Sequence, residues 1–138
     1  MFIVNLLCYG YNTRGELDKA EEMYRKALAL FEALASKQGM AQTYGNLGNV
    51  AYTRGELDKA EEMYRKSLEI SEALGLKEAT ANQYGNLGVV YKKRGNLAQA
   101  EAAWKKSLSL YQEMGAMQHS GAKNVQRWRD ELAQKRVQ

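Results

Sequence analysis

Residues Thr13 to Lys26 read TRGELDKAEEMYRK, and residues Thr53 to Lys66 repeat this string letter for letter, 40 positions further on. The same offset relates Tyr44-Gly45-Asn46-Leu47-Gly48 to Tyr84-Gly85-Asn86-Leu87-Gly88. Self-similarity at a fixed period of 20 to 50 residues is typical of repeat architectures. We therefore predict three units, over residues 1–36, 37–76 and 77–115, followed by a terminal helix over 116–136 within a single domain of 138 residues.

Each unit is predicted to form two helices. In the second unit Tyr44, Leu47, Gly48 and Ala51 recur with the spacing of one helix face, and Arg54-Gly55 then interrupts the pattern. A second helical stripe follows and ends at Leu74-Gly75, with glycine as the terminator; its members are Leu57, Ala60, Tyr64, Ser67, Leu68 and Ser71. The absence of proline permits long uninterrupted helices. The predicted fold class is all-α, a right-handed solenoid of three helix pairs with a C-terminal capping helix.

Small residues recur where the two helices of a unit are expected to cross. Gly48 and Gly88 fall inside helical patterns, where glycine costs about 1 kcal/mol relative to alanine. The aromatic residues Tyr64 and Trp104 follow the alanines of the second helices by four positions. We expect the aromatic rings to fill the space that the glycines leave free.

The three units share a pattern that resembles the tetratricopeptide repeat: a large residue, Leu-Gly, Tyr, and later Ala-x3-aromatic. It reads Tyr84…Leu87-Gly88…Tyr91 with Ala100…Trp104, and the first unit reads Val4…Leu7-Cys8…Tyr11 with Ala20…Tyr24. The 40-residue period and the missing proline make it similar to the long variety found in kinesin light chains and Pins-type scaffolds. The resemblance covers about residues 1 to 115.

The resemblance implies a non-catalytic protein-interaction module, a scaffold or adaptor, that binds a protein or peptide segment in a concave groove lined by the first helix of each unit. Carried over position by position, the candidate groove residues are Asn5, Tyr9, Asn12, Gln42, Asn46, Asn49, Tyr52, Thr53, Asn82, Asn86, Val89, Lys92 and Lys93. Each asparagine amide both donates and accepts hydrogen bonds, so a row of amides can satisfy the backbone of an extended peptide without reading its sequence. The alternative reading is tolerated polarity on an exposed helix face.

Two other functions are open at this point. The apolar residues Phe2, Ile3 and Leu6 have no polar helix before them, so the chain could self-associate into homo-oligomers through this face. The terminal helix carries Lys123, Arg127, Arg129, Lys135 and Arg136, a basic cluster that could bind RNA or an acidic partner. The alternative interpretation is that this helix is a polar cap, which packs on the third unit through Trp128. The net charge of +4 alone indicates no nucleic-acid partner.

An enzyme is not expected, and no catalytic, metal or cofactor residues are assigned. A single cysteine and a single histidine exclude thiolate cages and His-pair metal sites, and no phosphate-binding loop is visible. His119 is expected to be a solvated loop residue, and Cys8 a small packing residue. No stretch reaches the roughly 18 apolar residues of a membrane helix, so no membrane association is expected. The lack of targeting signals favours a cytoplasmic protein.

Overall fold

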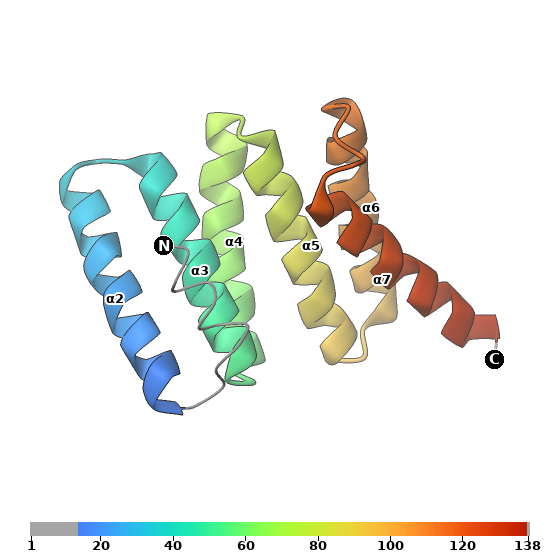
Figure 1. The fold of residues 1–138 in the computed structure, drawn as a ribbon, viewed down its shortest axis with the longest axis horizontal. Helices are drawn as coiled ribbons and strands as arrows, with labels where there is room; N and C mark the ends of the chain where they lie inside the picture. Colours follow the sequence, from blue (N-terminus) through green and yellow to red (C-terminus); the bar gives the residue numbers. More distant parts are fainter. Residues whose placement is uncertain (1–13, 138) are drawn as a thin grey trace. The chain divides into compact units, whose positions relative to one another are not determined.

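The computed structural model describes residues 14–137, and all the regular structure in this range is helical. The helices are α2 (Arg14–Ala33), α3 (Lys37–Thr53), α4 (Leu57–Leu74), α5 (Lys77–Lys93), α6 (Leu97–Glu113) and α7 (Ser120–Val137), as labelled in Figure 1. The described part of the chain is therefore an all-α repeat fold, as the periodicity predicts. Within residues 14–137, no helix is both long and apolar enough to cross a bilayer.

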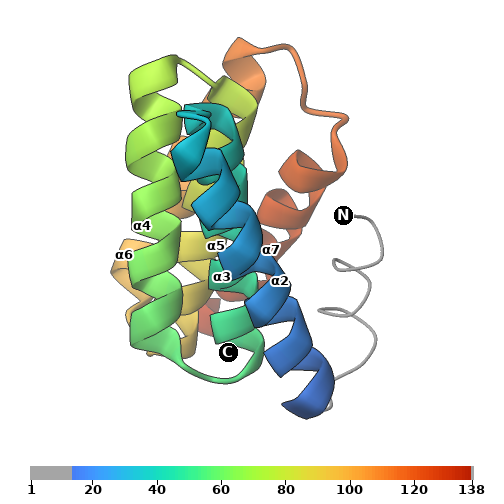
Figure 2. The same ribbon diagram turned by 90° about the vertical axis from the view of Figure 1, so that its left-hand side faces the viewer.

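The chain divides into two compact units, one that extends to Leu74 and one that begins at Gly75. In the first unit α3 packs against both α2 and α4, and in the second unit α6 packs against α5 and α7. Consecutive helices within each unit run antiparallel, as Figure 1 and Figure 2 show. The helices are joined by connections of only a few residues, and such short connections favour an antiparallel arrangement of neighbouring helices.

The connections are Schellman turns that end each helix on a residue with positive φ. After α3, the Gly55 amide donates to the Tyr52 carbonyl at 2.9 Å, and the next amide donates to the Ala51 carbonyl at 2.9 Å. Gly55 has a φ of +80°, a conformation that glycine adopts without steric cost. The same pair of bonds follows α5 and α6. The predicted breaks at Arg54-Gly55 and Leu74-Gly75 are thus confirmed.

The core lies between the predicted stripes. In the first unit Leu17, Ala20, Tyr24, Leu47, Val50 and Met63 form one cluster of buried side chains. Ala60 and Tyr64 of the second predicted stripe are buried, and Leu57 and Leu68 are half-buried. In the second unit Trp104 and Tyr111 are fully enclosed.

The close approach expected at the glycines is confirmed in both units. A Cβ atom placed on Gly48 would lie 2.6 Å from Cδ1 of the Tyr64 ring, a separation that real Cβ atoms do not show. The ring of Trp104 fills the matching space over Gly88. Each unit also buries one serine that donates across the helix pair, Ser67 to the Ala41 carbonyl and Ser107 to the Ala81 carbonyl, both at 2.7 Å. The pairs α3–α4 and α5–α6, which are related by an offset of 40 positions in the sequence, therefore pack in the same way.

The terminal helix begins later than its predicted range of 116–136. The helix α7 begins at Ser120, and the side chain of His119 just before it accepts a hydrogen bond from the Gly121 amide. Ala122, Val125 and Leu132 of α7 are buried. The ring centroid of Trp128 lies 6.0 Å from that of Trp104, so Trp128 packs on the third predicted repeat, residues 77–115, as expected.

Candidate interaction surface on the inner helices

The candidate binding residues in the described range lie on α3 and α5, the first helices of the second and third predicted units. On α3, Gln42 is exposed, and Asn46, Asn49, Tyr52 and Thr53 are half-buried. On α5, Lys93 is exposed, and Asn82, Asn86, Val89 and Lys92 are half-buried. Both helices therefore present a polar edge that borders the core and reaches solvent. Asn5, Tyr9, Asn12, Phe2, Ile3, Leu6 and Cys8 lie outside the described residues.

Hydrogen bonds divide these asparagines into two kinds. Asn49 accepts a hydrogen bond from the Tyr64 hydroxyl through its Oδ1 at 2.6 Å, and Asn82 accepts one from the Tyr111 hydroxyl. In both cases the amide oxygen is committed to a tyrosine of the second helix, which fixes the side chain. The amide nitrogen of each side chain is a further hydrogen-bond donor.

Asn46 and Asn86 make fewer contacts. Asn86 donates from its Nδ2 to Gln83 at 3.3 Å, which leaves its own amide oxygen as an acceptor. The side chain of Asn46 makes no hydrogen bond within the part of the chain that the structure describes. The half-buried amide of Asn46 therefore keeps both a donor and an acceptor for a ligand. Sequence reasoning identified these positions but could not separate the two kinds, because the tyrosine partners lie 15 and 29 residues away.

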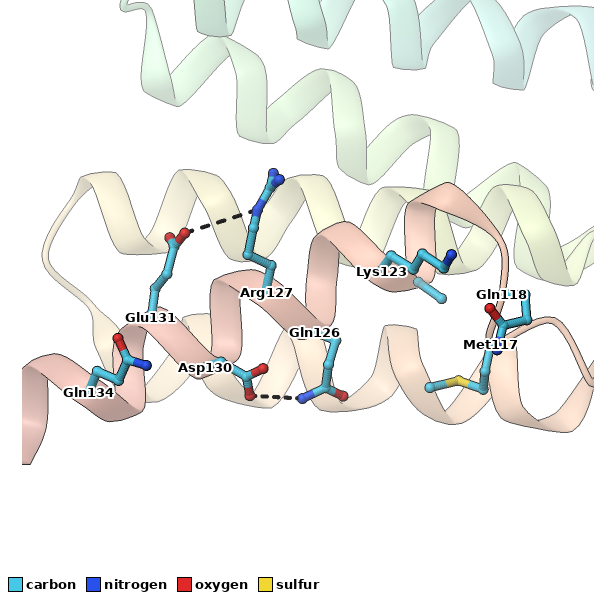
Figure 3. A pocket seen from close by; sticks show the side chains of 9 residues that line it. Met117, Gln118, Lys123, Gln126, Arg127, Asp130, Glu131 and Gln134 are labelled. Atoms are coloured by element: carbon cyan, nitrogen blue, oxygen red, sulfur yellow. Dashed lines mark hydrogen bonds and ion pairs between the residues drawn. The ribbon is translucent and has the colours of Figure 1, made fainter.

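The terminal helix does not present a purely basic surface. Arg136 pairs with Glu101 of α6 at 2.8 Å, and Arg127 approaches Glu131 at 4.0 Å. Figure 3 shows that Gln126 donates to Asp130 along the same face, at 3.0 Å. This face borders an open hollow of about 490 Å³ that is lined by Met117, Gln118, Ala122, Lys123, Gln126, Arg127, Asp130, Glu131 and Gln134. Its charge is therefore mixed, which weakens the case for an RNA site.

His119 is exposed, as expected, but it is not merely solvated. Its Nδ1 accepts a hydrogen bond from the Gly121 amide at 3.0 Å, so it caps the first turn of α7. Its Nε2 lies 3.1 Å from a carboxylate oxygen of Glu78, and its ring stacks on Tyr111 with centroids 5.5 Å apart. Burial raises the pKa of Tyr111, and the charge of Glu78 adds to the rise. These contacts hold the start of α7 against α5 and α6.

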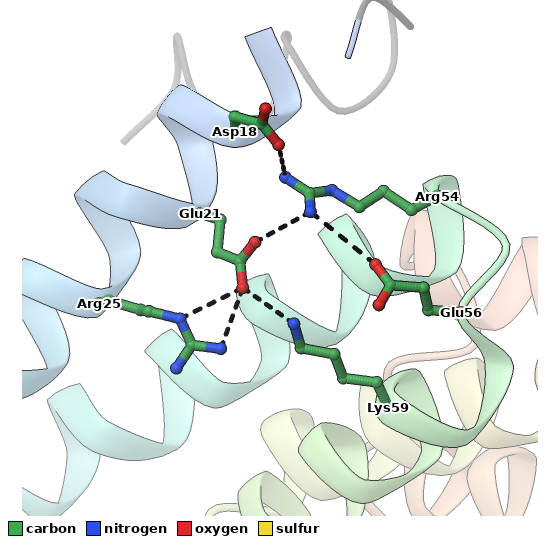
Figure 4. A network of polar contacts seen from close by, with 6 residues as sticks. All are labelled: Asp18, Glu21, Arg25, Arg54, Glu56 and Lys59. Carbon is green, nitrogen blue, oxygen red and sulfur yellow. Dashed lines mark hydrogen bonds and ion pairs between the residues drawn. The ribbon is translucent and has the colours of Figure 1, made fainter. Parts of the chain in front are cut away.

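A second polar site was missed in the sequence. Glu21 of α2 stands in a run of charged residues, yet its side chain is only 18% exposed. Arg54, which follows α3, contacts Asp18 and lies 3.1 Å from Glu21, and Lys59 of α4 lies 2.9 Å from the same carboxylate (Figure 4). The hydrogen bond from Lys59 is the main cause that lowers the pKa of Glu21. Only the fold reveals this network, because it joins residues 36 and 38 positions apart.

No site for a metal ion is evident in the described range. Residues 14–137 contain no group of three or more histidine, cysteine, aspartate or glutamate side chains placed to hold one. The polar edges of α3 and α5 instead consist of neutral amides, hydroxyls and two lysines. Such groups form hydrogen bonds with a peptide backbone but lack a nucleophile paired with a base.

Comparison with known proteins agrees with this architecture. The family model of the tetratricopeptide repeat matches residues 3–73 and 39–113. The crystal structure of BtubC (BKLC) from P. vanneervenii superposes with a TM-score of 0.75 at 27% sequence identity. That match covers 88% of this chain and 50% of the BtubC chain, so the chain spans about half the length of that protein. No curated protein matches it. The chain belongs to the tetratricopeptide repeat family.

Proposed function

We propose that the chain is a non-catalytic protein-interaction module that binds an extended peptide segment along the inner helices of its repeats, the expected concave groove. Tetratricopeptide repeats generally mediate protein–protein interaction, and the family is typically non-catalytic. The peptide site itself is our proposal. It rests on the polar edges of α3 and α5, where half-buried side-chain amides alternate with buried core residues.

The observation that carries the proposal is the unequal use of the asparagine amides. Asn49 and Asn82 are fixed by tyrosine hydroxyls, so their free donors are already positioned. Asn46 has an uncommitted donor and acceptor one helical turn before Asn49 on the same edge. Because a fixed side chain loses little conformational freedom on binding, such an edge is suited to recognise the carbonyl and amide groups of an extended backbone. Tyr52 adds flat contact area at low entropic cost.

The proposal makes a directional prediction for alanine substitutions. A peptide library is titrated against the full chain by calorimetry, and the best ligand is then measured against Asn46→Ala and Asn86→Ala. Each substitution removes an amide that would pair with the peptide backbone, so we expect an affinity loss of about 5- to 20-fold, equivalent to about 1–2 kcal/mol. Circular dichroism checks that both variants keep their helix content.

The control is Gln112→Ala, which removes an exposed amide from α6, the second helix of its pair. It should leave the affinity unchanged within about twofold, because surface substitutions away from a site have small effects. Retention of full affinity by both asparagine variants would exclude this edge as the binding surface. Equal losses in all three variants would point to a general loss of folding.

A further inference from the structure

The single histidine of the chain lies where the three helices of the second unit meet. His119 directly precedes α7, and its ring stacks on Tyr111 of α6 with centroids 5.5 Å apart. Its Nε2 atom lies 3.1 Å from a carboxylate oxygen of Glu78 on α5. Its Nδ1 atom accepts a hydrogen bond from the Gly121 amide at 3.0 Å. One imidazole therefore joins the first turn of α7 to both α5 and α6.

The partners of the two ring nitrogens define the protonation state that these contacts require. The Gly121 amide can only donate a hydrogen bond, so Nδ1 must be the nitrogen without a proton. The single proton of the neutral ring then lies on Nε2, which faces the carboxylate of Glu78, an acceptor. The neutral imidazole thus satisfies both neighbours. A protonated ring also carries a hydrogen on Nδ1, and that hydrogen would point at the N–H group of Gly121.

The turn that His119 holds covers a buried hydrogen bond. The Tyr111 hydroxyl donates to Oδ1 of Asn82, and Tyr111 is fully buried. Gly121 lies directly against both partners, since a Cβ atom on it would meet the Tyr111 hydroxyl and would lie 3.2 Å from Oδ1 of Asn82. Burial raises the pKa of Tyr111, and the charge of Glu78 adds to the rise, so the hydroxyl remains a donor in the range where histidine titrates. The first turn of α7 therefore closes over the bond that joins α5 to α6.

The charges around His119 decide which form of the ring suits the closed turn. Glu78 attracts the protonated ring, but the side chains of His119 and Glu78 are 39% and 63% exposed, and exposed ion pairs contribute little. On α6, Glu113 is paired with Lys77 of α5 at 3.5 Å. On α7, Lys123 lies one turn further on and adds a positive charge. The N-terminus of a helix also disfavours a cation, and protonation removes the acceptor of a backbone amide. The closed turn therefore favours the neutral ring.

We propose that His119 is a pH-sensitive latch on α7. The neutral ring fixes the first turn of α7 over the pair of Tyr111 and Asn82, and the protonated ring releases that turn. Histidine is the side chain that ordinarily changes charge between about pH 5 and pH 8, and the chain contains one. The turn is therefore closed at about pH 7.5 and loosened at about pH 5.5. The latch needs no peptide ligand, so its failure would leave the proposed function untouched.

The exchange of the Gly121 amide with water reports the latch directly, because the first amides of a helix have no partner within the helix. The exchange rate is measured by NMR on the full chain at about pH 7.5 and about pH 5.5, and each rate is divided into the intrinsic rate at that pH. In the original chain we expect the protection of this amide to fall by about fivefold or more at the lower pH, since a helix cap is worth about this factor. His119→Ala should show the low protection at both pH values.

His119→Asn is the matched variant. The Oδ1 atom of asparagine stands at the position of Nδ1 in histidine, accepts a hydrogen bond from the amide two residues further on, and does not titrate. The protection of Gly121 in this variant should therefore differ by less than about twofold between the two pH values. Circular dichroism at both pH values checks that the variants keep their helix content.

Three results would overturn the proposal. Equal protection of Gly121 at both pH values in the original chain would show that protonation does not release the turn. Higher protection at the lower pH would show that the attraction of Glu78 outweighs the lost acceptor. A loss of protection that persists in His119→Asn would assign the pH dependence to another group.

Discussion

At the residue scale, the position of Ala35 is the clearest departure from the repeat. Ala35 has a φ of +54°, whereas the matching residues Gly75 and Gly115 have φ values of +70° and +64°. The left-handed conformation brings Cβ close to the following carbonyl oxygen, at a cost of roughly 1–2 kcal/mol for a residue other than glycine. The Schellman bonds still form, since the Ser36 amide donates to the Phe31 carbonyl at 2.9 Å. The turn after α2 is thus imposed by the helices that it joins.

Replacement of this alanine is expected to stabilise the protein. Ala35→Gly removes the Cβ strain but increases the freedom of the unfolded chain, so the free energy of unfolding should rise by about 0.5–1 kcal/mol. Urea titration followed by circular dichroism measures the change. Gly115→Ala is the reverse substitution and serves as the control. It introduces the same strain after α6 and should lower the free energy of unfolding by a similar amount. Equal stability of Ala35→Gly and the original chain would show that the strain in this turn does not exceed the entropic cost of glycine in the unfolded chain.

At the element scale, the two described pairs α3–α4 and α5–α6 each pack a glycine of the first helix against a ring of the second helix. Tyr64 is 3% exposed, and its hydroxyl is fixed by Asn49. Trp104 is fully buried and donates from its Nε1 to the Gly85 carbonyl at 3.1 Å. These polar contacts prevent the rings from moving away, so the crossing tolerates no additional atom. The same residues that close the core therefore also position the asparagine edge.

Gly48→Ala tests this crossing. A methyl group at this position would lie 2.6 Å from the Tyr64 ring, and overpacking of this kind costs about 1–3 kcal/mol. The higher helix propensity of alanine offsets about 1 kcal/mol of the cost. We expect a net loss of about 0–2 kcal/mol in the free energy of unfolding, measured by urea titration.

Gly15→Ala is the matched control for this prediction. A Cβ atom on Gly15 meets nothing within 4 Å, so the substitution should be neutral or slightly stabilising. If Gly48→Ala proves as stable as Gly15→Ala, the close approach of α3 and α4 is not needed for folding.

At the scale of the whole molecule, charge as well as apolar packing joins α2 to the following hairpin of α3 and α4. Glu21 receives Arg54 and Lys59 from the following hairpin and Arg25 from its own helix. A carboxylate that meets three cations is stabilised in its ionised form. Exposed ion pairs within one helix, such as Glu62 with Lys66 of α4 at 3.2 Å, contribute much less to stability. The network around Glu21 is thus the site where pH should act on stability.

The lowered pKa of Glu21 fixes the sign of this pH dependence. Its stabilising contribution is fully present above the pKa of the unfolded carboxyl group, about 4.3, and is lost as the pH falls through the lower pKa of the folded state. The free energy of unfolding should therefore fall as the pH is lowered below about 5, and Glu21→Gln should reduce this slope. Denaturant titrations at several pH values measure it. Glu22→Gln, which removes an exposed carboxylate, should leave the slope nearly unchanged; an identical slope in Glu21→Gln would contradict the assignment.

Much of the fold could be predicted because its signals are local or periodic. The stripes of Leu47 and Ala60, the breaks at Gly55 and Gly75, and the match of Gly48 with Tyr64 all follow from spacing along the chain. The candidate edge of α3 and α5 was identified from the resemblance, and its asparagines are indeed partly exposed. Whether they bind a peptide stays a prediction. The cap formed by His119 could not be predicted, because histidine rarely signals a helix start.

The sequence by itself determined the repeat, the helices and the residues that close each pair, because these depend on a hydrophobic period that recurs every 40 positions. Only the tertiary structure decided how identical strings are used: Met63 is buried while Met23 is exposed, and Glu21 is enclosed by cations from the next hairpin. The physical reason is that burial and charge pairing depend on which neighbour a helix face meets. Two identical segments in different places in the array therefore acquire different environments.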